Sequence, residues 1–422
     1  MSKHAERMSL SEELAWRGFV NQTTYADLKE LDKGRLTFYQ GFDASAPSQQ
    51  IGNLAFMMMA RVFMRHGHRA VILAGGATSL IGDPGGKDVE RTLQGEKTIA
   101  ANVKNAESQL KRVFSGYQFK LVNNLDWTKR LNVIDFLRDI GKHFSMTTLV
   151  QRDYIARRIG NESSGISYAE FSYTLLQGMD YLHLYDVHGV TLQLGGSDQW
   201  GNCLSGVELV RKARGAEVHA VTTPLVINKT TGKKFGKSED GAVWLDPKMT
   251  SPTQFYQFWI NADDQGVEDY LKIFTDMSKP EISEIMASHQ ENRKTRLAQT
   301  ALAEAITRLL HGAVTTEVAR EITNVLAGKV LVGDASRQVI AQMRREVAHA
   351  QATPGEPLAD VVVRTGLAAS KTEARRLVTD NAITINYQKA AKDTLNETDF
   401  SAGRLLLRKG KSFKDSALVE LA

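Results

Sequence analysis

The stretch LTFYQGFDASAPSQQIGNLAF, residues 36–56, decides the fold class of this chain. It opens with a short run of strand-forming side chains, crosses a polar loop, and enters an apolar helical pattern from Leu54 to Phe63. Two further strand-like runs end in glycine-bearing turns, VILAGGAT at residues 71–78 and VTLQLGGSD at residues 190–198. Strands that alternate with helices are typical of βαβ units on a parallel sheet. We therefore predict an α/β fold for the first half of the chain.

These three segments share one property, which is that polar residues and glycines follow directly after a strand. In open α/β sheets, ligands bind outside the carboxyl ends of the strands. The helical pattern that opens at Leu54 adds free N–H groups at its N-terminus, which attract anions. Taken singly, each segment reads as an ordinary strand–loop–helix connection. Together they predict one ligand site at this edge of the sheet.

Composition places the chain among ordinary globular proteins with several domains. With 422 residues it is too long for one compact core, and we expect two to four domains. No apolar run reaches the ~20 residues that span a bilayer, and the polar N-terminus, with Ser9 and Glu12 spaced as a capping box, does not resemble a signal peptide. The single cysteine, Cys203, excludes an internal disulfide framework and favours a reduced, cytoplasmic setting. The net charge of +5 is only weakly indicative of a polyanionic partner.

The remainder of the chain divides into further regions. From about Ser251 to Leu326 the pattern is mainly helical, and a segment rich in small residues, 348–355, is interpreted as a linker. We accordingly predict a first domain over residues 1–230, a helical domain over 231–347 and a small C-terminal unit over 356–422.

A basic loop, KKFGKS at residues 233–238, is the next candidate for chemistry. Two lysines and a hydroxyl around a glycine suit a loop that closes on phosphates, because lysine supplies point charges and glycine allows close backbone approach. In isolation a solvated basic turn explains such a run better. Whether this loop indicates phosphate binding therefore depends on the other segments of the sequence.

Those segments resemble class I aminoacyl-tRNA synthetases, and more specifically the bacterial tyrosyl-tRNA synthetases. The resemblance rests on the segments GGATSLIGDP at 75–84, FLRDIGKHF at 136–144, EFSYTLLQ at 170–177 and LGGSDQWGN at 194–202, together with residues 39–54 and the basic loop. It covers essentially the whole chain in order. It implies a Rossmann-like catalytic domain with an inserted dimer-interface segment, then an α-helical domain and a small α+β RNA-binding domain. It also implies a homodimer.

The same resemblance implies that the chain is a tyrosine–tRNA ligase acting on L-tyrosine, ATP and tRNA(Tyr). Tyr39 and Asp180 match the residues that bind the substrate phenol, while Tyr173, Gln177 and Asp83 match those that hold the α-ammonium group, with Thr78 in the same set. Independently, residues 173, 177 and 180 fall at i, i+4 and i+7, on one helix face. A solvated polar face is the alternative, and the neighbouring Leu-Leu pair fits it poorly.

For the nucleotide, the resemblance points to two groups of residues. The positions expected to contact ATP or the adenylate are Gly41, Asp43, Gly52, Gly196, Asp198 and Gln199. Those expected around the departing pyrophosphate are Lys87, Arg91, Lys234, Lys237 and the hydroxyl of Ser238, with plain surface charge as the alternative for the first two. No carboxylate cluster indicates a dedicated metal site, so Mg²⁺ is expected to arrive with ATP.

The chain departs from the family where the signature normally reads His-x-Gly-His. Gln50 and Asn53 stand at the two histidine positions, and Ser45 keeps a hydroxyl where the family has threonine. The amide NH2 groups can donate where imidazole donated, although glutamine cannot become a cation. Losing one donor outright costs about 2.7–4 kcal/mol in such a site, and an amide recovers part of that. We expect a working but slower activation step.

The C-terminal unit resembles the small RNA-binding module of many bacterial members. Its basic positions are Lys371, Arg375 and Arg376 on a capped helix, and Arg408, Lys409 and Lys411 near the end of the chain. Such a face would contact phosphates and bind in a salt-dependent manner. An ordinary amphipathic helix is the alternative.

Two other functions remain open at this point. One is a paralogue with weakened or lost adenylation that serves as a tRNA-binding or regulatory protein. The other is an enzyme that activates a tyrosine analogue for a biosynthetic pathway. The retained phenol-binding pair and basic loop favour the ligase, because a chain without adenylation has no physical reason to keep both.

Overall fold

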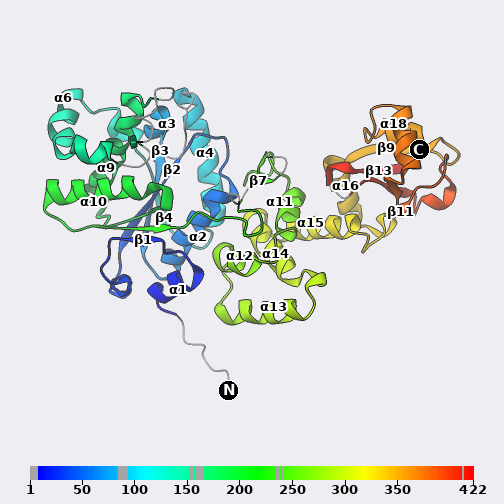
Figure 1. Cartoon of the computed structure of the whole chain (residues 1–422), viewed down its shortest axis with the longest axis horizontal. Coiled ribbons are helices and arrows are strands. Elements are labelled where there is room, and N and C mark those ends of the chain that lie inside the picture. Colours follow the sequence, from blue (N-terminus) through cyan, green and yellow to red (C-terminus); the bar gives the residue numbers. More distant parts are fainter. Residues whose placement is uncertain are drawn as a thin grey trace, which may run out of the picture. The chain divides into compact units, whose positions relative to one another are not determined.

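The computed structural model describes residues 8–83, 94–151, 155–156, 165–232, 235, 237–238, 241–410 and 413–422. The chain forms two compact units (Figure 1). The first comprises Met1–Asp246 and Ala262–Ala298, and the second comprises Pro247–Asn261 and Gln299–Ala422. This division differs from the predicted domain bounds, because residues 262–298 of the predicted helical domain belong to the first unit.

A six-stranded sheet organises the first unit, in the order β1-β6-β5-β2-β3-β4. Its strands are β1 (Gln22–Thr23), β2 (Thr37–Asp43), β3 (Arg69–Gly75), β4 (Phe119–Asn123), β5 (Leu192–Gly196) and β6 (His219–Thr223). All neighbouring pairs are parallel except β1 with β6. The predicted α/β class with a parallel sheet is therefore confirmed. Within it, β2 lies between β3 and β5, so the three predicted strands are neighbours.

Helices cover both faces of this sheet (Figure 1). The helices of the unit are α1 (Leu10–Arg17), α2 (Ile51–Arg65), α3 (Thr78–Ile81), α4 (Glu96–Val113), α5 (Leu125–Thr128), α6 (Val133–Asp135), α7 (Met146–Val150), α9 (Tyr168–His188), α10 (Trp200–Arg214), α12 (Val267–Phe274) and α13 (Lys279–Glu291). On one face, α9 and α10 pack against each other and on the sheet, with Tyr39, Tyr181 and Leu209 in a shared core. On the other, Phe38 of β2 contacts Phe63 of α2.

Local sequence signals explain the ends of the helices that carry the site. Ser167 and Glu170 form a capping box at the start of α9, and Gly189 ends it with the left-handed backbone that glycine adopts most easily. The capping box predicted from Ser9 and Glu12 is present at the start of α1. Helix α12 joins this unit because Arg17 of α1 donates to the carbonyls of Lys272 and Thr275, at 2.6 and 2.8 Å.

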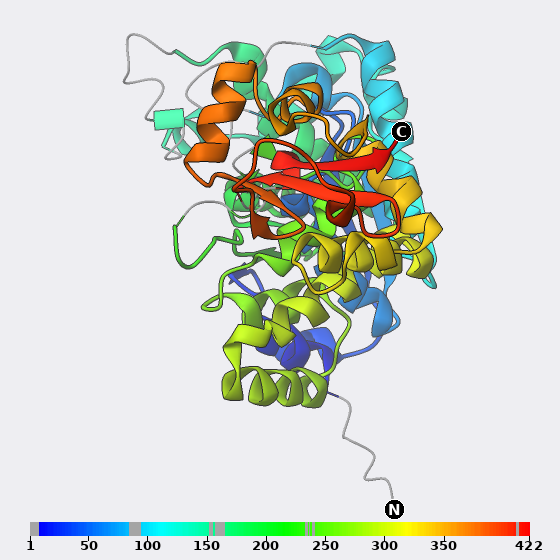
Figure 2. The ribbon, with the colours of Figure 1, turned by 90° about the vertical axis from the view of Figure 1, so that its right-hand side faces the viewer.

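The second unit holds its own five-stranded sheet, in the order β11-β10-β12-β13-β9. Its strands are β9 (Ala348–Ala352), β10 (Ile383–Ile385), β11 (Gln388–Lys389), β12 (Arg404–Lys409) and β13 (Ser416–Leu421), and its helices are α11 (Pro252–Ile260), α14 (Leu297–His311), α15 (Ala313–Leu326), α16 (Arg337–Glu346), α17 (Leu358–Arg364) and α18 (Lys371–Thr379). Figure 2 shows this sheet in red and orange, with α18 beside it.

The predicted linker over residues 348–355 is wrong. Residues 348–352 form β9, which pairs in parallel with β13, and Ala350 and Ala352 are buried. Alanine has a low strand propensity, so the pairing is set by tertiary packing rather than by local preference.

No helix in the described part of the chain is long and apolar enough to span a membrane.

Candidate active site

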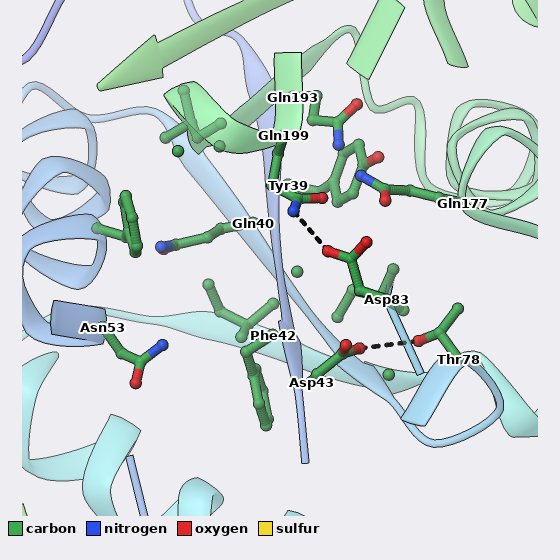
Figure 3. Close-up of a pocket in the computed structure, with 18 of the residues that line it drawn as sticks. Tyr39, Gln40, Phe42, Asp43, Asn53, Thr78, Asp83, Gln177, Gln193 and Gln199 are labelled. Carbon is green, nitrogen blue, oxygen red and sulfur yellow. Dashed lines mark hydrogen bonds between the residues drawn. The ribbon is translucent and has the colours of Figure 1, made fainter. Parts of the chain in front are cut away.

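A cavity of about 220 Å³ opens at the carboxyl ends of β2, β3 and β5, where the three predicted segments meet (Figure 3). Helices α2, α4 and α9 complete its wall. The residues that line it are Tyr39, Gln40, Gly41, Phe42, Asp43, Gln49, Asn53, Phe56, Met57, Ile72, Leu73, Gly75, Thr78, Asp83, Leu110, Tyr173, Gln177, Asp180, Gln193, Leu194, Gly195, Gly196, Asp198 and Gln199. The parallel register places the ends of these strands side by side, which concentrates polar groups in one place.

Tyr39 and Asp180 form one polar end of the cavity. Tyr39 is only 1% exposed, and its hydroxyl has no hydrogen-bond partner among the described residues. Asp180 is 2% exposed and accepts two hydrogen bonds of 2.9 Å, from Asn124 Nδ2 and Trp127 Nε1. A buried hydroxyl without a partner is costly, so this end is built for a ligand that supplies one.

Burial sets the protonation of this pair. It raises the pKa of Asp180 to about 7, against the hydrogen bonds from Asn124 and Trp127, which lower it. Burial also raises the pKa of Tyr39 well above its ordinary value, so its hydroxyl stays protonated. The pair therefore offers a donor and an anionic acceptor to one ligand group. A hydroxyl, which both accepts and donates, fits that arrangement.

Asn124 and Trp127 are functional residues that the sequence analysis missed. Asn124 follows β4 directly, and Trp127 lies on the short helix after it, stacked on His183 with ring centroids 4.1 Å apart. The signal was available in principle, since β4 is another strand whose carboxyl end carries polar residues. Its run at residues 119–123, FKLVN, is short and half polar, and it does not stand out as a buried strand.

A second polar group lies nearer the middle of the cavity and is acidic. Tyr173 donates to both carboxylate oxygens of Asp43 at 3.2 Å, and Thr78 Oγ1 donates to Asp43 Oδ1 at 3.1 Å. Gln199 Nε2 donates to Asp83 Oδ2 at 2.6 Å. Two carboxylates around one space favour a cationic ligand group.

Two of the expected contacts, those of Asp43 and Gln199, change with this geometry, whereas Gln177 lies where it was expected. Asp43 was expected to contact the nucleotide, and the structure places it against Tyr173 and Thr78 instead, in the acidic group. Gln199, also expected to contact the nucleotide, is bonded to Asp83. Gln177 lines the same space, and its buried Oε1 has no partner among the described residues.

The opposite end of the cavity lies beside the start of α2. Gly41, Gly196 and Asp198 line it, as expected for the nucleotide. A Cβ atom on Gly196 would lie 2.8 Å from Phe56 Cζ and 2.7 Å from Asp198 Oδ1, so only glycine leaves the Asp198 carboxylate in place. Gly52 is exposed and does not line the cavity.

The altered signature residues differ from one another in placement. Asn53 lines the cavity, its Oδ1 accepts from the backbone N–H of Gln50 at 3.0 Å, and Figure 3 shows its amide nitrogen turned toward the cavity. Gln50 does not line the cavity, and its backbone bridges to Trp244. Ser45 lies in the loop before α2, outside the cavity lining. Of the three, only Asn53 lines the ligand space directly.

Several expected residues lie outside the described part of the chain. Lys87 and Arg91 fall within residues 84–93, and Lys234 and Lys411 are likewise not described. Lys237 and Ser238 are described by their backbone, which forms β7 (Lys237–Ser238) and pairs with β8 (Gly241–Ala242).

The basic residues expected to bind RNA divide into two sets. Arg375 and Arg376 are exposed on α18, and Lys371 is exposed while pairing with Asp360 at 2.9 Å. Arg408 points inward, is only partly exposed and donates to the carbonyl of Leu326, at the end of α15. Lys409 donates to the carbonyl of Leu367 at 3.3 Å. Arg408 thus supplies a donor to one of the last carbonyls of α15, which have no partner within the helix.

Within the described residues there is no cluster of three or more histidine, cysteine or acidic side chains that could hold a metal ion.

Comparison with known proteins identifies the relatives of both units. Residues 31–327 match the family described as tRNA synthetases class I (W and Y), and residues 339–414 match the tyrosine–tRNA ligase SYY-like C-terminal domain. The chain is 44% identical over 419 residues to a tyrosine–tRNA ligase of Leifsonia xyli, covering 97% of this chain and 94% of that protein. A tyrosine–tRNA ligase of Streptomyces coelicolor is 42% identical over 419 residues, with 97% and 98% covered.

Solved structures agree with these relatives. A C-terminally truncated mitochondrial tyrosyl-tRNA synthetase of Aspergillus nidulans superposes with a TM-score of 0.69 at 30% identity, covering 76% of this chain and 95% of that one. A tyrosyl-tRNA synthetase from Archaeoglobus fulgidus, complexed with L-tyrosine, has a TM-score of 0.54 at 14% identity over 73% of this chain and 99% of that one. The second similarity speaks for the fold alone.

Proposed function

Because the chain belongs to the class I tyrosyl-tRNA synthetases and is a tyrosine–tRNA ligase, we propose how its cavity divides the two substrates of the first step. In that step the tyrosine carboxylate attacks the α-phosphorus of ATP, a new oxygen–phosphorus bond forms, and pyrophosphate leaves. In the second step a ribose hydroxyl of the terminal adenosine of tRNA(Tyr) attacks the carbonyl carbon, and AMP leaves. No covalent enzyme intermediate is needed, so the protein contributes positioning and electrostatics.

The phenol of tyrosine occupies the end of the cavity formed by Tyr39 and Asp180. The observation that carries this assignment is the buried Tyr39 hydroxyl without a partner beside a carboxylate held by Asn124 and Trp127. Tyr39 donates to the phenol oxygen, and ionised Asp180 accepts the phenol proton in a hydrogen bond. Phenylalanine would leave the buried Tyr39 hydroxyl without a partner and would offer no proton to the Asp180 carboxylate.

The α-ammonium group of tyrosine occupies the acidic middle of the cavity. Asp43 and Asp83 supply negative charge, and the Gln177 carbonyl, which has no partner among the described residues, supplies an acceptor. The carboxylate then points toward the start of α2, where the α-phosphate of ATP must lie. Three acceptors around an ammonium group match its three donors.

ATP occupies the end beside α2, with its ribose toward Asp198 and Gly196. The positive end of the α2 dipole and the amide of Asn53 face its phosphates. Lys87, Arg91, Lys234, Lys237, Ser238 and Ser45 are proposed to stabilise the departing pyrophosphate. Mg²⁺ is proposed to arrive bound to the ATP phosphates.

Aminoacylation of tRNA tests the proposed reaction as a whole. The purified chain, supplied with ATP, radioactive tyrosine and tRNA(Tyr), is expected to form acid-precipitable tyrosyl-tRNA. Tyrosine binding without any product would indicate a tRNA-binding paralogue instead.

Tyrosine binding is expected to strengthen as pH rises from about 6 to about 8. The carboxylate of Asp180, whose pKa burial raises to about 7, must be ionised to accept the phenol proton. Below that pKa the free enzyme must release a proton first, so the Kd rises by up to about tenfold per pH unit. Calorimetric titrations across this range, in buffers of different ionisation enthalpy, measure both the Kd and the released proton. A pH-independent Kd would contradict the assignment of Asp180.

We propose that the chain is a homodimer, through an apolar surface at the top of the first unit. Its residues are Val133, Ile134, Leu137, Met146 and Tyr168, all exposed. They lie on α6, on the π-helical turn Phe136–Ile140, on α7 and at the start of α9, and the last three of these elements contribute Phe136, Leu149 and Phe171 to one core. Contiguous exposed apolar side chains of this kind mark a protein interface.

The substitution Ile134→Glu is expected to convert this dimer to a monomer at micromolar concentration. Ile134 is 66% exposed, so the change leaves the fold intact, while two copies would bring unpaired charges into an apolar contact. Light scattering coupled to size-exclusion chromatography measures the mass. As a control, Val187→Glu alters an exposed apolar residue at the far end of α9 and leaves the mass unchanged.

The C-terminal unit is proposed to bind tRNA through Lys371, Arg375 and Arg376 on the exposed side of α18. Phosphate contacts of this kind weaken with rising salt. Lys411, which lies outside the described residues, is proposed to contact tRNA as well, whereas Arg408 and Lys409 donate to backbone carbonyls within the unit. The site of action is proposed to be the cytoplasm, where a buried Cys203 stays reduced.

A further inference from the structure

The loop from Ala44 to Gln49 joins β2 to α2 and carries the nucleotide end of the cavity. It belongs to neither a strand nor a helix, so its backbone has no hydrogen-bond ladder of its own. Buried backbone groups nevertheless need partners. The elements that supply them decide where the start of α2 lies.

A row of amide side chains on α4 supplies three of these partners, and Ser79 Oγ and Gln94 Nε2 supply two more, to the N–H of Ala44 at 2.8 Å and the carbonyl of Ser45 at 2.9 Å. Asn102 Nδ2 donates to the carbonyl of Ala44 at 2.8 Å, and Asn105 Nδ2 donates to that of Pro47 at 3.2 Å. Gln109 Oε1 accepts from the N–H of Gln49 at 2.9 Å. Residues 102, 105 and 109 lie at i, i+3 and i+7, on one face of the helix. We call these three residues the amide row.

Burial makes two members of the amide row, Asn102 and Gln109, hard to replace by water, whereas Asn105 is exposed. Asn102 is 5% exposed and Gln109 is 3% exposed, and the Ser48 side chain between them is also buried. Gln109 Nε2 donates to Ser48 Oγ at 2.9 Å, and Ser48 Oγ donates to the carbonyl of Gln49 at 2.8 Å. None of the three amide-row residues lines the cavity, so they do not touch a ligand there.

The opposite side of the loop is held by the segment that follows the basic loop. The N–H of Ile51 donates to the carbonyl of Val243 at 3.1 Å, and the N–H of Leu245 donates to that of Gln49 at 2.9 Å. The N–H of Asp246 donates to Ser48 Oγ at 3.1 Å. Ser48 thus receives hydrogen bonds from both sides. The loop is held between α4 and the chain leaving β8.

We propose that the amide row positions the nucleotide-binding loop for adenylate formation, so that Asn102, Asn105 and Gln109 are positioning residues for ATP and not for tyrosine. This inference rests on the proposed function. Reactions catalysed by positioning lose rate steeply when a reacting group shifts by about 1 Å. The amide row contacts the backbone that sets the start of α2, while the Tyr39–Asp180 end is held by β2, α9 and residues 124–127.

The test compares ATP and tyrosine in the same variants, with tyrosine-dependent ATP–pyrophosphate exchange as the assay. Asn102→Leu keeps the branched shape and Gln109→Met keeps the length, and both remove the hydrogen bonds. Each is expected to raise the KM for ATP about tenfold, and the double variant further, while the calorimetric Kd for tyrosine stays within about twofold of the wild type. Ser108→Ala changes an exposed hydroxyl on the same helix and is the control.

Three results would decide against this inference. An unchanged KM for ATP in both variants would mean that the loop holds its position without the amide row. A parallel weakening of tyrosine binding would mean that the row supports the whole fold. Wild-type protein without tyrosine-dependent exchange would overturn the proposed function itself, which is a different failure and is seen before any variant is made.

Discussion

Asp180→Asn is expected to lower kcat/KM for tyrosine in ATP–pyrophosphate exchange by roughly 100-fold or more. The substitution keeps the shape of the side chain and replaces one carboxylate oxygen by an NH2 group. Asn124 and Trp127 already donate to the two oxygens, so the new amide places a donor against a donor. It also removes the charge that the phenol proton requires. Both effects act on groups with almost no access to water.

The same experiment measures discrimination against phenylalanine. Tyrosyl-tRNA synthetases are the reference case for this kind of selectivity, with rejection of phenylalanine by about 10⁵. We expect Asp180→Asn to lose most of this discrimination, because kcat/KM for tyrosine falls while kcat/KM for phenylalanine changes little. Asp186→Asn, on the exposed side of the same helix, is the matched control. If kcat/KM for tyrosine is the same in Asp180→Asn as in the wild type, the phenol does not lie between Tyr39 and Asp180.

Lys237→Ala is expected to lower the rate of adenylate formation by about 10²–10³-fold and to leave tyrosine affinity unchanged. The backbone of Lys237 pairs with Ala242, and the next residue, Val243, accepts a hydrogen bond from Ile51 at the start of α2. The basic loop therefore returns to the chain beside the end of the cavity assigned to phosphates. A cation at this point stabilises charge that develops on the departing pyrophosphate.

Single-turnover formation of tyrosyl-adenylate, with calorimetry for tyrosine, separates the two quantities. Lys229→Ala is the matched control, since Lys229 precedes the basic loop and pairs at the surface with Asp269. An equal fall in the rate of adenylate formation in both variants would mean that only the net charge of the region matters. An unchanged rate for Lys237→Ala would remove the basic loop from the mechanism.

The sheet and the place of the cavity were predictable from local sequence patterns, because ligands bind at the carboxyl ends of parallel strands. Residues 36–43, 71–78 and 190–198 read as strands with polar ends, and parallel strands bring such ends together. The resemblance to a family then named side chains around the cavity. It could not say which of them touch one another. The bonds from Tyr173 to Asp43 and from Gln199 to Asp83 depend on how α9 and the turn after β5 pack.

The features that could not be predicted from the sequence depend on tertiary contacts. β9 was taken for a linker because alanine carries no strand signal, and β13 alone makes it a strand. Gln50 was assigned to catalysis because its position matches a histidine, and the sequence could not show that it lies outside the residues that line the cavity. The amide row on α4 looks like a solvated helix face until the loop is placed against it.

An assay of the activation step tests most directly whether this chain forms tyrosyl-adenylate. Exchange of radioactive pyrophosphate into ATP is followed at saturating ATP, with tyrosine, phenylalanine or no amino acid present. The account predicts exchange that depends on tyrosine and is negligible with phenylalanine, at a rate lowered by the amides at positions 50 and 53. Absence of tyrosine-dependent exchange from a protein that still binds tyrosine would contradict it, and the chain would then be a tRNA-binding paralogue of the enzyme.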